Sequence, residues 1–230
     1  GTHHGDGPVS AQSDRRRAAL NRMAKDDPEL AARLILMTLP GAASKVDKTM
    51  SYVLDVEELG AHRVSISGGR ARVDRVDKDG DEDVDFRLQA NARTLVDLVT
   101  GAHGPVGLMM RGRLRIRGKR RKALKLRKMG SGDLSMADVV EAGGTLDPDI
   151  LYRSLPYVID ADWTKGHTFT VRYVVTGENG GTWYVTANDG EPLAVTQDER
   201  DAAGTATVSL DTYQRMASGQ ISPSIAMQNQ

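Results

Sequence analysis

Apolar and polar residues alternate with a period of two along several stretches of the chain, and this alternation predicts β-strands. It runs through residues 63–66, 70–75 and 84–88, and Gly68-Gly69 separates the first two of these stretches as a hairpin turn. Residues 52–56 are mostly apolar and are expected to be a further extended segment. Residues 111–118 show the same period with arginine at every second position. We expect this last segment to be a strand with one apolar face and one arginine face.

A spacing near 3.6 residues predicts helices between these strands. Leu30, Leu34 and Met37 lie on one face of such a helix, which we expect to stop at Leu39-Pro40-Gly41 because proline cannot continue the hydrogen bonding. A second helix is expected to begin after the capping residue Asn91 and to end at Gly101.

The order of these features recurs in the second half of the chain. Matching positions in the two halves are Leu39-Pro40 with Leu155-Pro156, Tyr52 with Phe169, Val64 with Val185, Gly101 with Gly219, Pro105 with Pro223, and Met109 with Met227. Two copies of a unit of about 117 residues therefore fit better than one long domain. The second copy reaches Gln230 before any equivalent of the arginine strand, so we expect it to be C-terminally incomplete.

These patterns predict four regions along the chain. Residues 1–14 are polar and rich in Gly and Ser, as in a disordered or tag-like tail, and residues 15–129 form the first unit. Residues 130–147 read as a linker with a short helix of its own, and residues 148–230 form the second, incomplete unit.

The charge is balanced in total but is unevenly distributed. The chain has 31 Lys and Arg against 31 Asp and Glu, yet residues 111–128 hold eleven basic residues and no acid. Three interpretations follow, in order of preference: neutralisation by the acidic run at 74–85, contact with anionic membrane lipid or acyl-CoA phosphates, and nucleic-acid binding. Nucleic acid is least favoured, because no aromatic residue lies between Arg111 and Lys128 to stack on bases.

Composition excludes several classes of protein. No apolar run approaches the roughly 20 residues of a membrane-spanning helix, and the absence of cysteine excludes disulfides and thiolate chemistry. The acidic run lacks the glycine and glutamate spacing of an EF-hand, so we expect neither a metal site nor a cofactor. No catalytic motif is present, and His103, with Asp97 as its partner, is the one candidate acid or base.

One segment of the first unit carries a family resemblance. Thr94-Leu95-x-x-Leu98-x-x-Gly101, then Pro105, Met109-Met110 and the pattern Gly-x-Leu-x-Ile-x-Gly at 112–118 resemble the sterol carrier protein 2 family, over about residues 35–129. A weaker copy of the pattern lies at 151–227. The resemblance implies an α+β fold of two tandem sterol-carrier-like units, each a curved mixed sheet of about five strands with helices packed on one face around an apolar tunnel.

The resemblance also implies binding of a sterol, a fatty acid or an acyl-CoA, and we expect a cytoplasmic protein of lipid transport. The candidate pocket residues are Leu95, Leu98, Val99, Val106, Leu108, Met109, Met110, Leu114, Ile116, Met216, Ile225 and Met227. The candidate contacts for an anionic group are Arg111, Arg113, Arg115 and Arg117. Three alternatives remain open: an enzyme that isomerises or cyclises a hydrophobic metabolite in the same cavity, a non-catalytic scaffold that binds a partner, and a homodimer.

Overall fold

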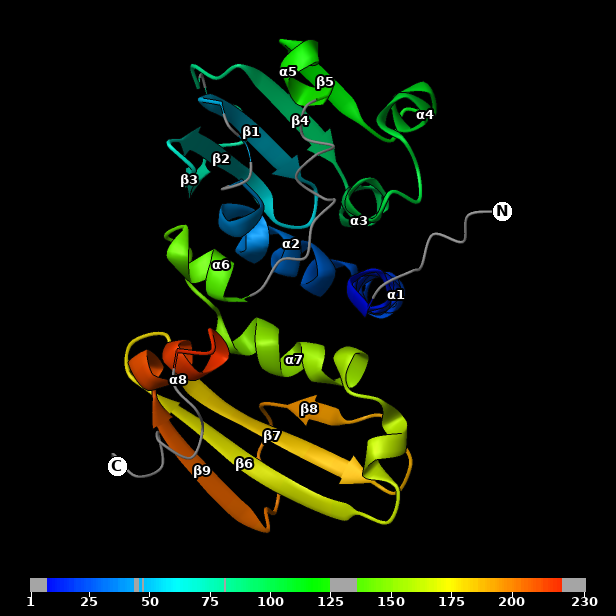
Figure 1. The fold of residues 1–230 in the computed structure, drawn as a ribbon, viewed down its shortest axis with the longest axis vertical. Coiled ribbons are helices and arrows are strands. Elements are labelled where there is room, and N and C mark those ends of the chain that lie inside the picture. Colours follow the sequence, from blue (N-terminus) through cyan, green and yellow to red (C-terminus); the bar gives the residue numbers. More distant parts are fainter. Residues whose placement is uncertain (1–7, 44–45, 47, 81, 125–135, 221–230) are drawn as a thin grey trace. The chain divides into compact units, whose positions relative to one another are not determined.

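The computed structural model describes residues 8–43, 46, 48–80, 82–124 and 136–220. The chain divides into two compact units, Gly1–Gly144 and Thr145–Gln230, which we describe separately as unit 1 and unit 2. Each unit holds one mixed sheet, with five strands in unit 1 and four in unit 2, and the expected α+β class is confirmed (Figure 1).

The sheet of unit 1 has the order β3-β2-β1-β4-β5. Its strands are β1 (Met50–Val56), β2 (Gly60–Ser67), β3 (Arg70–Val76), β4 (Phe86–Ala90) and β5 (Arg115–Gly118). Neighbouring strands are antiparallel except β1 and β4, which are parallel. Strand β5 therefore occupies one edge of the sheet.

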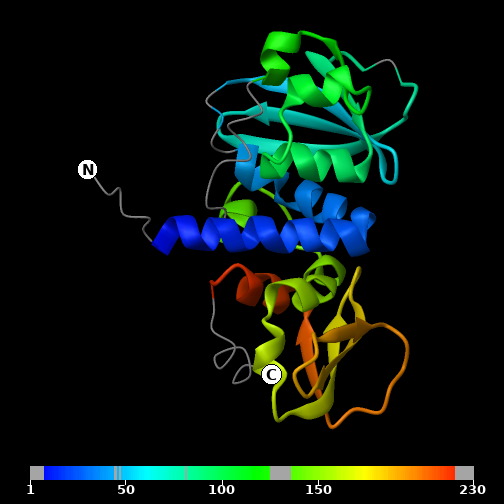
Figure 2. The same cartoon turned by 90° about the vertical axis from the view of Figure 1, so that its right-hand side faces the viewer.

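The described residues of unit 1 form the helices α1 (Pro8–Asp26), α2 (Pro28–Ala43), α3 (Ala92–Thr100), α4 (Pro105–Met110), α5 (Arg120–Leu124) and α6 (Met136–Glu141). Helices α1, α2 and α3 pack against one another on one face of the sheet (Figure 2). Helix α1 begins within the segment that the sequence pattern predicts as a tail, and α6, in the predicted linker, packs against α2.

Helix α2 continues past the predicted stop at Leu39-Pro40-Gly41 and ends at Ala43. The prediction of a stop at this position is wrong. Pro40 lies in the last turn of α2, where the helix tolerates it. Its missing N–H removes only one hydrogen bond there, with little helix left to disrupt.

Alternate residues of the strands in unit 1 face the helices and form the core. The largest of them are almost fully buried: Tyr52, Leu54, Val56, Val64, Ile66, Phe86, Leu88 and Ile116. The hydrophobic period of two, read from the sequence, therefore corresponds to the side of the sheet that the helices cover.

The acidic loop before β4 is attached to the opposite face of this sheet. Arg87 donates to the carbonyl oxygens of Lys78 and Gly80, and Arg63 pairs with Glu82 at 3.1 Å. On the same face Val53 is fully buried. The acidic loop is thus held by arginines of β2 and β4.

Unit 2 repeats the strand connections of the first four strands of unit 1. Its strands are β6 (Thr168–Thr176), β7 (Gly181–Asn188), β8 (Ala194–Thr196) and β9 (Gly204–Ser209), in the order β8-β7-β6-β9. As in unit 1, the pairing is antiparallel except between the first and last strands, β6 and β9. Helix α7 (Pro148–Val158) and the 3-10 helix Ala161–Thr164 precede the sheet, and α8 (Leu210–Ala217) follows it.

Aromatic rings fill the core of unit 2. Tyr152 of α7 stacks on Trp183 at a centroid distance of 5.0 Å and also contacts Tyr173 and Tyr213, at 5.2 and 5.5 Å. The indole N–H of Trp183 donates to Asp149 at 3.0 Å. The rings pack against Val175, Val185 and Val208 of the sheet.

Candidate functional site

The interior of unit 1 between the sheet and the helices is the candidate ligand site. Tyr52 and Phe86, neighbours on β1 and β4, stack at 4.9 Å with their planes 5° apart. Burial raises the pKa of the Tyr52 phenol, so this ring stays neutral in the interior. Three methionines of unit 1 are also buried, Met23 on α1, Met37 on α2 and Met50 on β1.

Most of the predicted pocket residues of unit 1 lie in this region. Leu95 on α3, Leu108 on α4, Leu114 and Ile116 are buried. Leu98, Val99 and Met109 are partly buried. These side chains come from the helix, the short helix after it and the edge strand that the family resemblance singles out.

Val106 and Met110 do not belong to the interior. Their side chains are 62% and 84% exposed, on the outer side of α4. The segment forms a helix, in which residues four apart share a face. Val106 and Met110 therefore point to solvent together while Leu108 points inward, and neither can line the pocket as predicted.

The predicted pocket residues of unit 2 have a different outcome. Met216 on α8 is partly buried and lies outside the aromatic core cluster. Ile225 and Met227 fall outside the described residues.

One polar side chain of the interior was not singled out by the sequence pattern. His62 on β2 is paired with Leu54 and alternates with Val64 and Ile66, so it faces the helices. Burial is the main cause that lowers the pKa of its imidazole, and Arg75 lowers it further, while the Gly60 carbonyl raises it. Its Nδ1 is buried and has no hydrogen-bond partner among the described residues. The alternation of His62 with Val64 and Ile66 in the sequence would have placed it on the apolar face of the strand.

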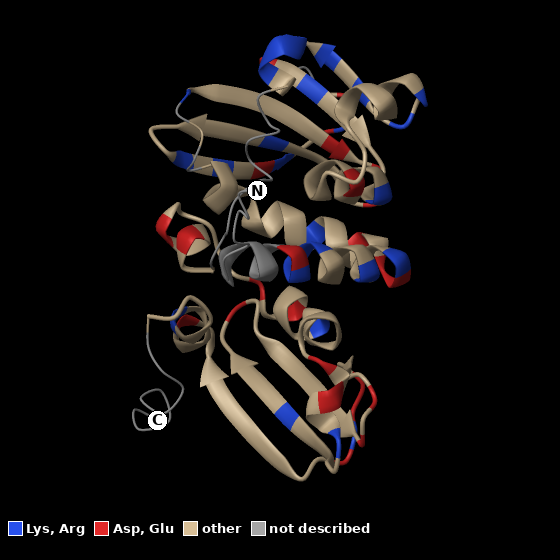
Figure 3. Ribbon diagram, turned by 45° about the vertical axis from the view of Figure 1, so that its right-hand side comes forward, with Lys and Arg blue, Asp and Glu red and all other residues tan. Residues whose placement is uncertain are grey.

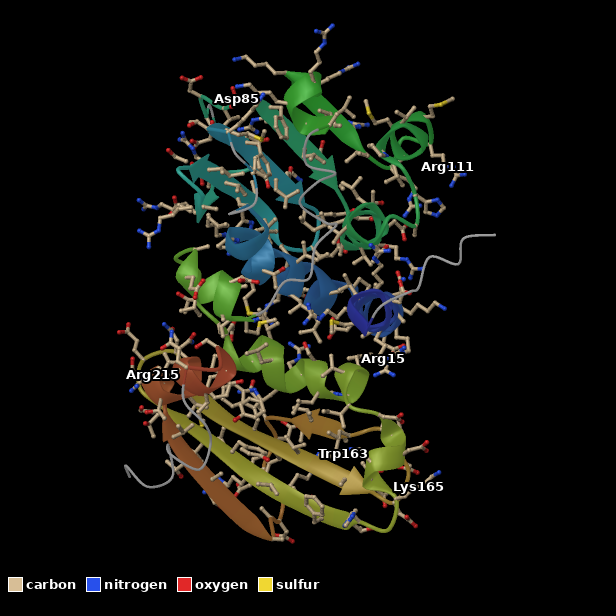
Figure 4. The ribbon with its side chains drawn as sticks, viewed as in Figure 1. Arg15, Asp85, Arg111, Trp163, Lys165 and Arg215 are labelled. Atoms are coloured by element: carbon tan, nitrogen blue, oxygen red, sulfur yellow. The ribbon has the colours of Figure 1, made fainter. Side chains whose placement is uncertain are left out.

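The four arginines predicted to contact an anionic group do not behave alike. Arg113 donates to the Asp97 carboxylate at 2.7 Å and to the Thr94 hydroxyl at 3.2 Å, so a carboxylate of the protein already occupies it. Arg111, Arg115 and Arg117 are exposed, and no carboxylate among the described residues lies within 4 Å of them. Figure 4 shows Arg111 extending away from α4.

Asp85 connects the start of β4 to α5. Its carboxylate accepts from the Ser51 amide at 3.0 Å, from Lys122 at 2.9 Å and from Lys119 at 3.4 Å. The Ser51 hydrogen bond, followed by the lysines, lowers the pKa of Asp85 from 3.8 to about 2. Asp85, at the end of the acidic run, thus pairs with two lysines of the basic segment.

His103 does not have the carboxylate partner predicted for it. Its side chain is exposed in the loop after α3, where its backbone N–H donates to the Asp97 carbonyl at 3.3 Å. The Asp97 carboxylate, predicted as its partner, is bound to Arg113 instead.

Two further classes of site are absent from the part of the chain that the structure describes. It contains no group of three or more His, Cys, Asp or Glu side chains that could hold a metal ion. Among the same residues, no helix has the length and apolar character needed to span a bilayer.

Several solved structures have partial similarity to this chain. Sterol carrier protein 2 from Yarrowia lipolytica is 19% identical, covering 55% of this chain and 92% of its own, with a TM-score of 0.28. The sterol carrier protein domain 2 of Helicoverpa armigera is 17% identical, covering 59% and 98%, also with a TM-score of 0.28.

An inverting sec-alkylsulfatase, Pisa1 from Pseudomonas sp., is 13% identical over 40% of this chain, with a TM-score of 0.34. This chain spans only 14% of the length of that enzyme. No curated protein matches this chain.

The family comparison covers the region that holds the candidate site. The matched segment runs from α2 through the whole sheet to the residues after α5, and so includes every strand of unit 1. Residues 33–129 match the SCP-2 sterol transfer family, which confirms the resemblance predicted for the first unit.

Proposed function

We propose that unit 1 binds a hydrophobic ligand, of the sterol, fatty acid or acyl-CoA class, between its sheet and helices α1 to α3. The observation that carries this proposal is the match of residues 33–129 to the SCP-2 sterol transfer family. The match includes the whole sheet of unit 1, helix α3 and most of α2, while α1 lies before it in the chain.

The side chains of the interior suit a ligand held by burial and few polar contacts. Leu95, Leu114 and Ile116 are buried at α3 and β5, and the buried methionines have flexible side chains that repack around different apolar shapes. His62 offers one polar group on this face, which can meet a hydroxyl or carboxyl of the ligand. Specificity should therefore be broad.

We propose that unit 2 is a second copy of the same unit. The shared strand order and pairing directions support a duplication, and Val64 and Val185, matched in the sequence, occupy equivalent places in the two sheets. In unit 2 stacked rings lie where unit 1 has smaller side chains, with Trp183 at the place of His62. We therefore expect unit 1 to be the principal binding unit.

The proposal is tested by extracting the purified chain with organic solvent and identifying the extracted lipids by mass spectrometry. Titration with a fluorescent fatty acid and a fluorescent sterol then gives the affinity of each class. We expect about one apolar ligand per chain. A chain that neither carries an apolar molecule nor binds the fluorescent ones would contradict the proposal.

A matched pair of variants locates the ligand. Leu95→Asn places an amide in the interior and should weaken binding by roughly tenfold or more, the effect of losing one buried apolar side chain. Val106→Asn makes the same chemical change on an exposed side chain and should leave the affinity unchanged. If Leu95→Asn does not fold, as judged by circular dichroism, Leu98→Asn on the same helix provides the test.

A further inference from the structure

The edge of unit 1 formed by α4, β5 and α5 combines unpaired positive charge with exposed apolar side chains. These three elements follow one another along the sheet edge in Figure 1, and Lys and Arg are concentrated there in Figure 3. We call residues 105–124 the basic edge.

Most of the charge on the basic edge has no acidic partner among the described residues. It carries eight Lys and Arg and no acid. Arg113, Lys119 and Lys122 pair with Asp97 and Asp85. The others are exposed and, among the described residues, have no carboxylate within 4 Å: Arg111, Arg115, Arg117, Arg120 and Arg121.

The same edge holds the exposed apolar side chains of the unit. Among the described residues of unit 1, the large apolar side chains with high exposure are Val106 and Met110 on α4 and Leu124 on α5. They lie at the two ends of β5, flanking its arginines. Apolar side chains interspersed with unpaired arginines are typical of a surface that meets a membrane interface.

We propose that the basic edge docks on an anionic lipid membrane, with Val106, Met110 and Leu124 entering the interfacial region and the unpaired arginines contacting lipid phosphates. Arginine binds phosphate through two parallel hydrogen bonds, and each basic residue near an anionic surface strengthens attachment. Nucleic acid also attracts arginine, but residues 105–124 contain no aromatic ring to stack on bases, and exposed Val, Met and Leu side chains gain nothing from a phosphate backbone.

The proposal does not depend on a ligand in unit 1, and its test uses none. The full chain is sedimented with vesicles of phosphatidylcholine alone and with vesicles that contain about one third phosphatidylserine. We expect binding to the anionic vesicles, weakening as salt rises. Equal binding to both vesicles, or binding to neither, contradicts the proposal.

Two pairs of arginine variants separate the basic edge from net charge. Arg111→Gln with Arg121→Gln should weaken vesicle binding about 25-fold, at about fivefold for each arginine. The control, Arg70→Gln with Arg172→Gln, removes two exposed arginines elsewhere and should change binding by less than about twofold. Equal losses in the two pairs mean that charge alone acts, and they overturn the assignment to this edge.

A third variant tests the apolar contribution. Val106→Ser with Met110→Ser should weaken binding to anionic vesicles while leaving its salt dependence unchanged, because no charge is removed. These side chains are exposed, so the fold is retained. Unchanged binding here, or duplex DNA that displaces the chain from vesicles and binds it more tightly, assigns the edge to a different partner and refutes membrane docking.

Discussion

Asp85 shows how a single carboxylate links distant parts of unit 1. Its donors come from β1, from the residue before α5 and from α5 itself, at separations of 34 to 37 residues. These hydrogen bonds act on the ionised carboxylate, and this is why the pKa of Asp85 lies below its ordinary value. The stability of unit 1 should therefore depend on pH in the acid range.

The expected pH dependence has a definite sign. Because the pKa is lower in the folded chain, the contribution of Asp85 is fully present above the ordinary value of 3.8 and is lost as the pH falls towards about 2. Asp85→Asn should lower the urea midpoint above pH 4 and flatten its decline in acid. Asp74→Asn, in an exposed pair with Arg72, is the control and should change little. Parallel acid profiles for Asp85→Asn and the unmodified chain would exclude this role.

The Arg113–Asp97 pair makes a different contribution, because Asp97 is buried. The Asp97 side chain is 9% exposed and that of Arg113 is 31% exposed. Arg113→Met leaves a buried carboxylate without its partner and should lower the free energy of unfolding by about 2–4 kcal/mol. Arg93→Met, whose guanidinium lies 3.9 Å from the other oxygen, should cost about 0.5 kcal/mol or less. Urea denaturation followed by circular dichroism measures both, and similar losses would argue against a special role for Arg113.

The alternating arginine segment 111–118 shows which features of single residues the sequence predicts and which it does not. Its period of two correctly places Leu114 and Ile116 inside and Arg115 and Arg117 outside. It fails at Arg113, because β5 begins only at Arg115 and the chain turns before it, at Gly112 with φ 71°. The Arg113–Asp97 ion pair joins residues 16 positions apart and depends on how α3 packs against this turn. No local sequence pattern specifies that packing.

At the scale of elements, the helix after the parallel strand begins in the same way in both units. Asn91 accepts from the Thr94 amide at 2.8 Å at the start of α3, and Ser209 accepts from the Thr212 amide at 3.1 Å at the start of α8. In unit 1 the Glu58 carboxylate also accepts from the Ala92 amide, at 2.9 Å. Such caps satisfy backbone donors that the first helical turn leaves free.

The two caps allow a matched prediction. Asn91→Ala should destabilise unit 1, and Ser209→Ala unit 2, each by about 1 kcal/mol. Both tryptophans, Trp163 and Trp183, lie in unit 2, so tryptophan fluorescence reports on that unit while circular dichroism reports on both. Ser209→Ala should therefore shift the fluorescence midpoint and Asn91→Ala should not. A fluorescence shift with Asn91→Ala would show that the two units unfold together.

Element prediction succeeded where one pattern dominated. The cap at Asn91 and the end at Gly101, with φ 76°, are both as the sequence predicts. The short apolar segment 105–110 is compatible with either a strand or a helix, since a run of this length does not distinguish the two periods. Its helical form decides which side chains are free to contact another surface.

At the scale of the whole molecule, the net charge of zero is the sum of a positive unit 1 and a negative unit 2. Unit 1 has 26 Lys and Arg against 20 Asp and Glu, and unit 2 has 5 against 11. The repeat predicted from the sequence matches Tyr52 with Phe169 and Val64 with Val185, but in the sheets Val64 pairs with Tyr52 and Val185 pairs with Val171. A slip of two residues keeps the same face, so a pattern of period two cannot detect it.

The division into two units also predicts how a ligand should affect stability. A molecule that binds only folded unit 1 stabilises that unit by mass action, by about 2.7 kcal/mol at roughly 100 times its Kd. A fatty acid or sterol at saturating concentration should therefore raise the thermal midpoint seen by circular dichroism and leave the midpoint seen by tryptophan fluorescence in place. Leu95→Asn should remove the shift, and Val106→Asn should keep it. A ligand that moves the fluorescence transition alone would place the binding site in unit 2, among the stacked rings of Tyr152, Tyr173, Trp183 and Tyr213.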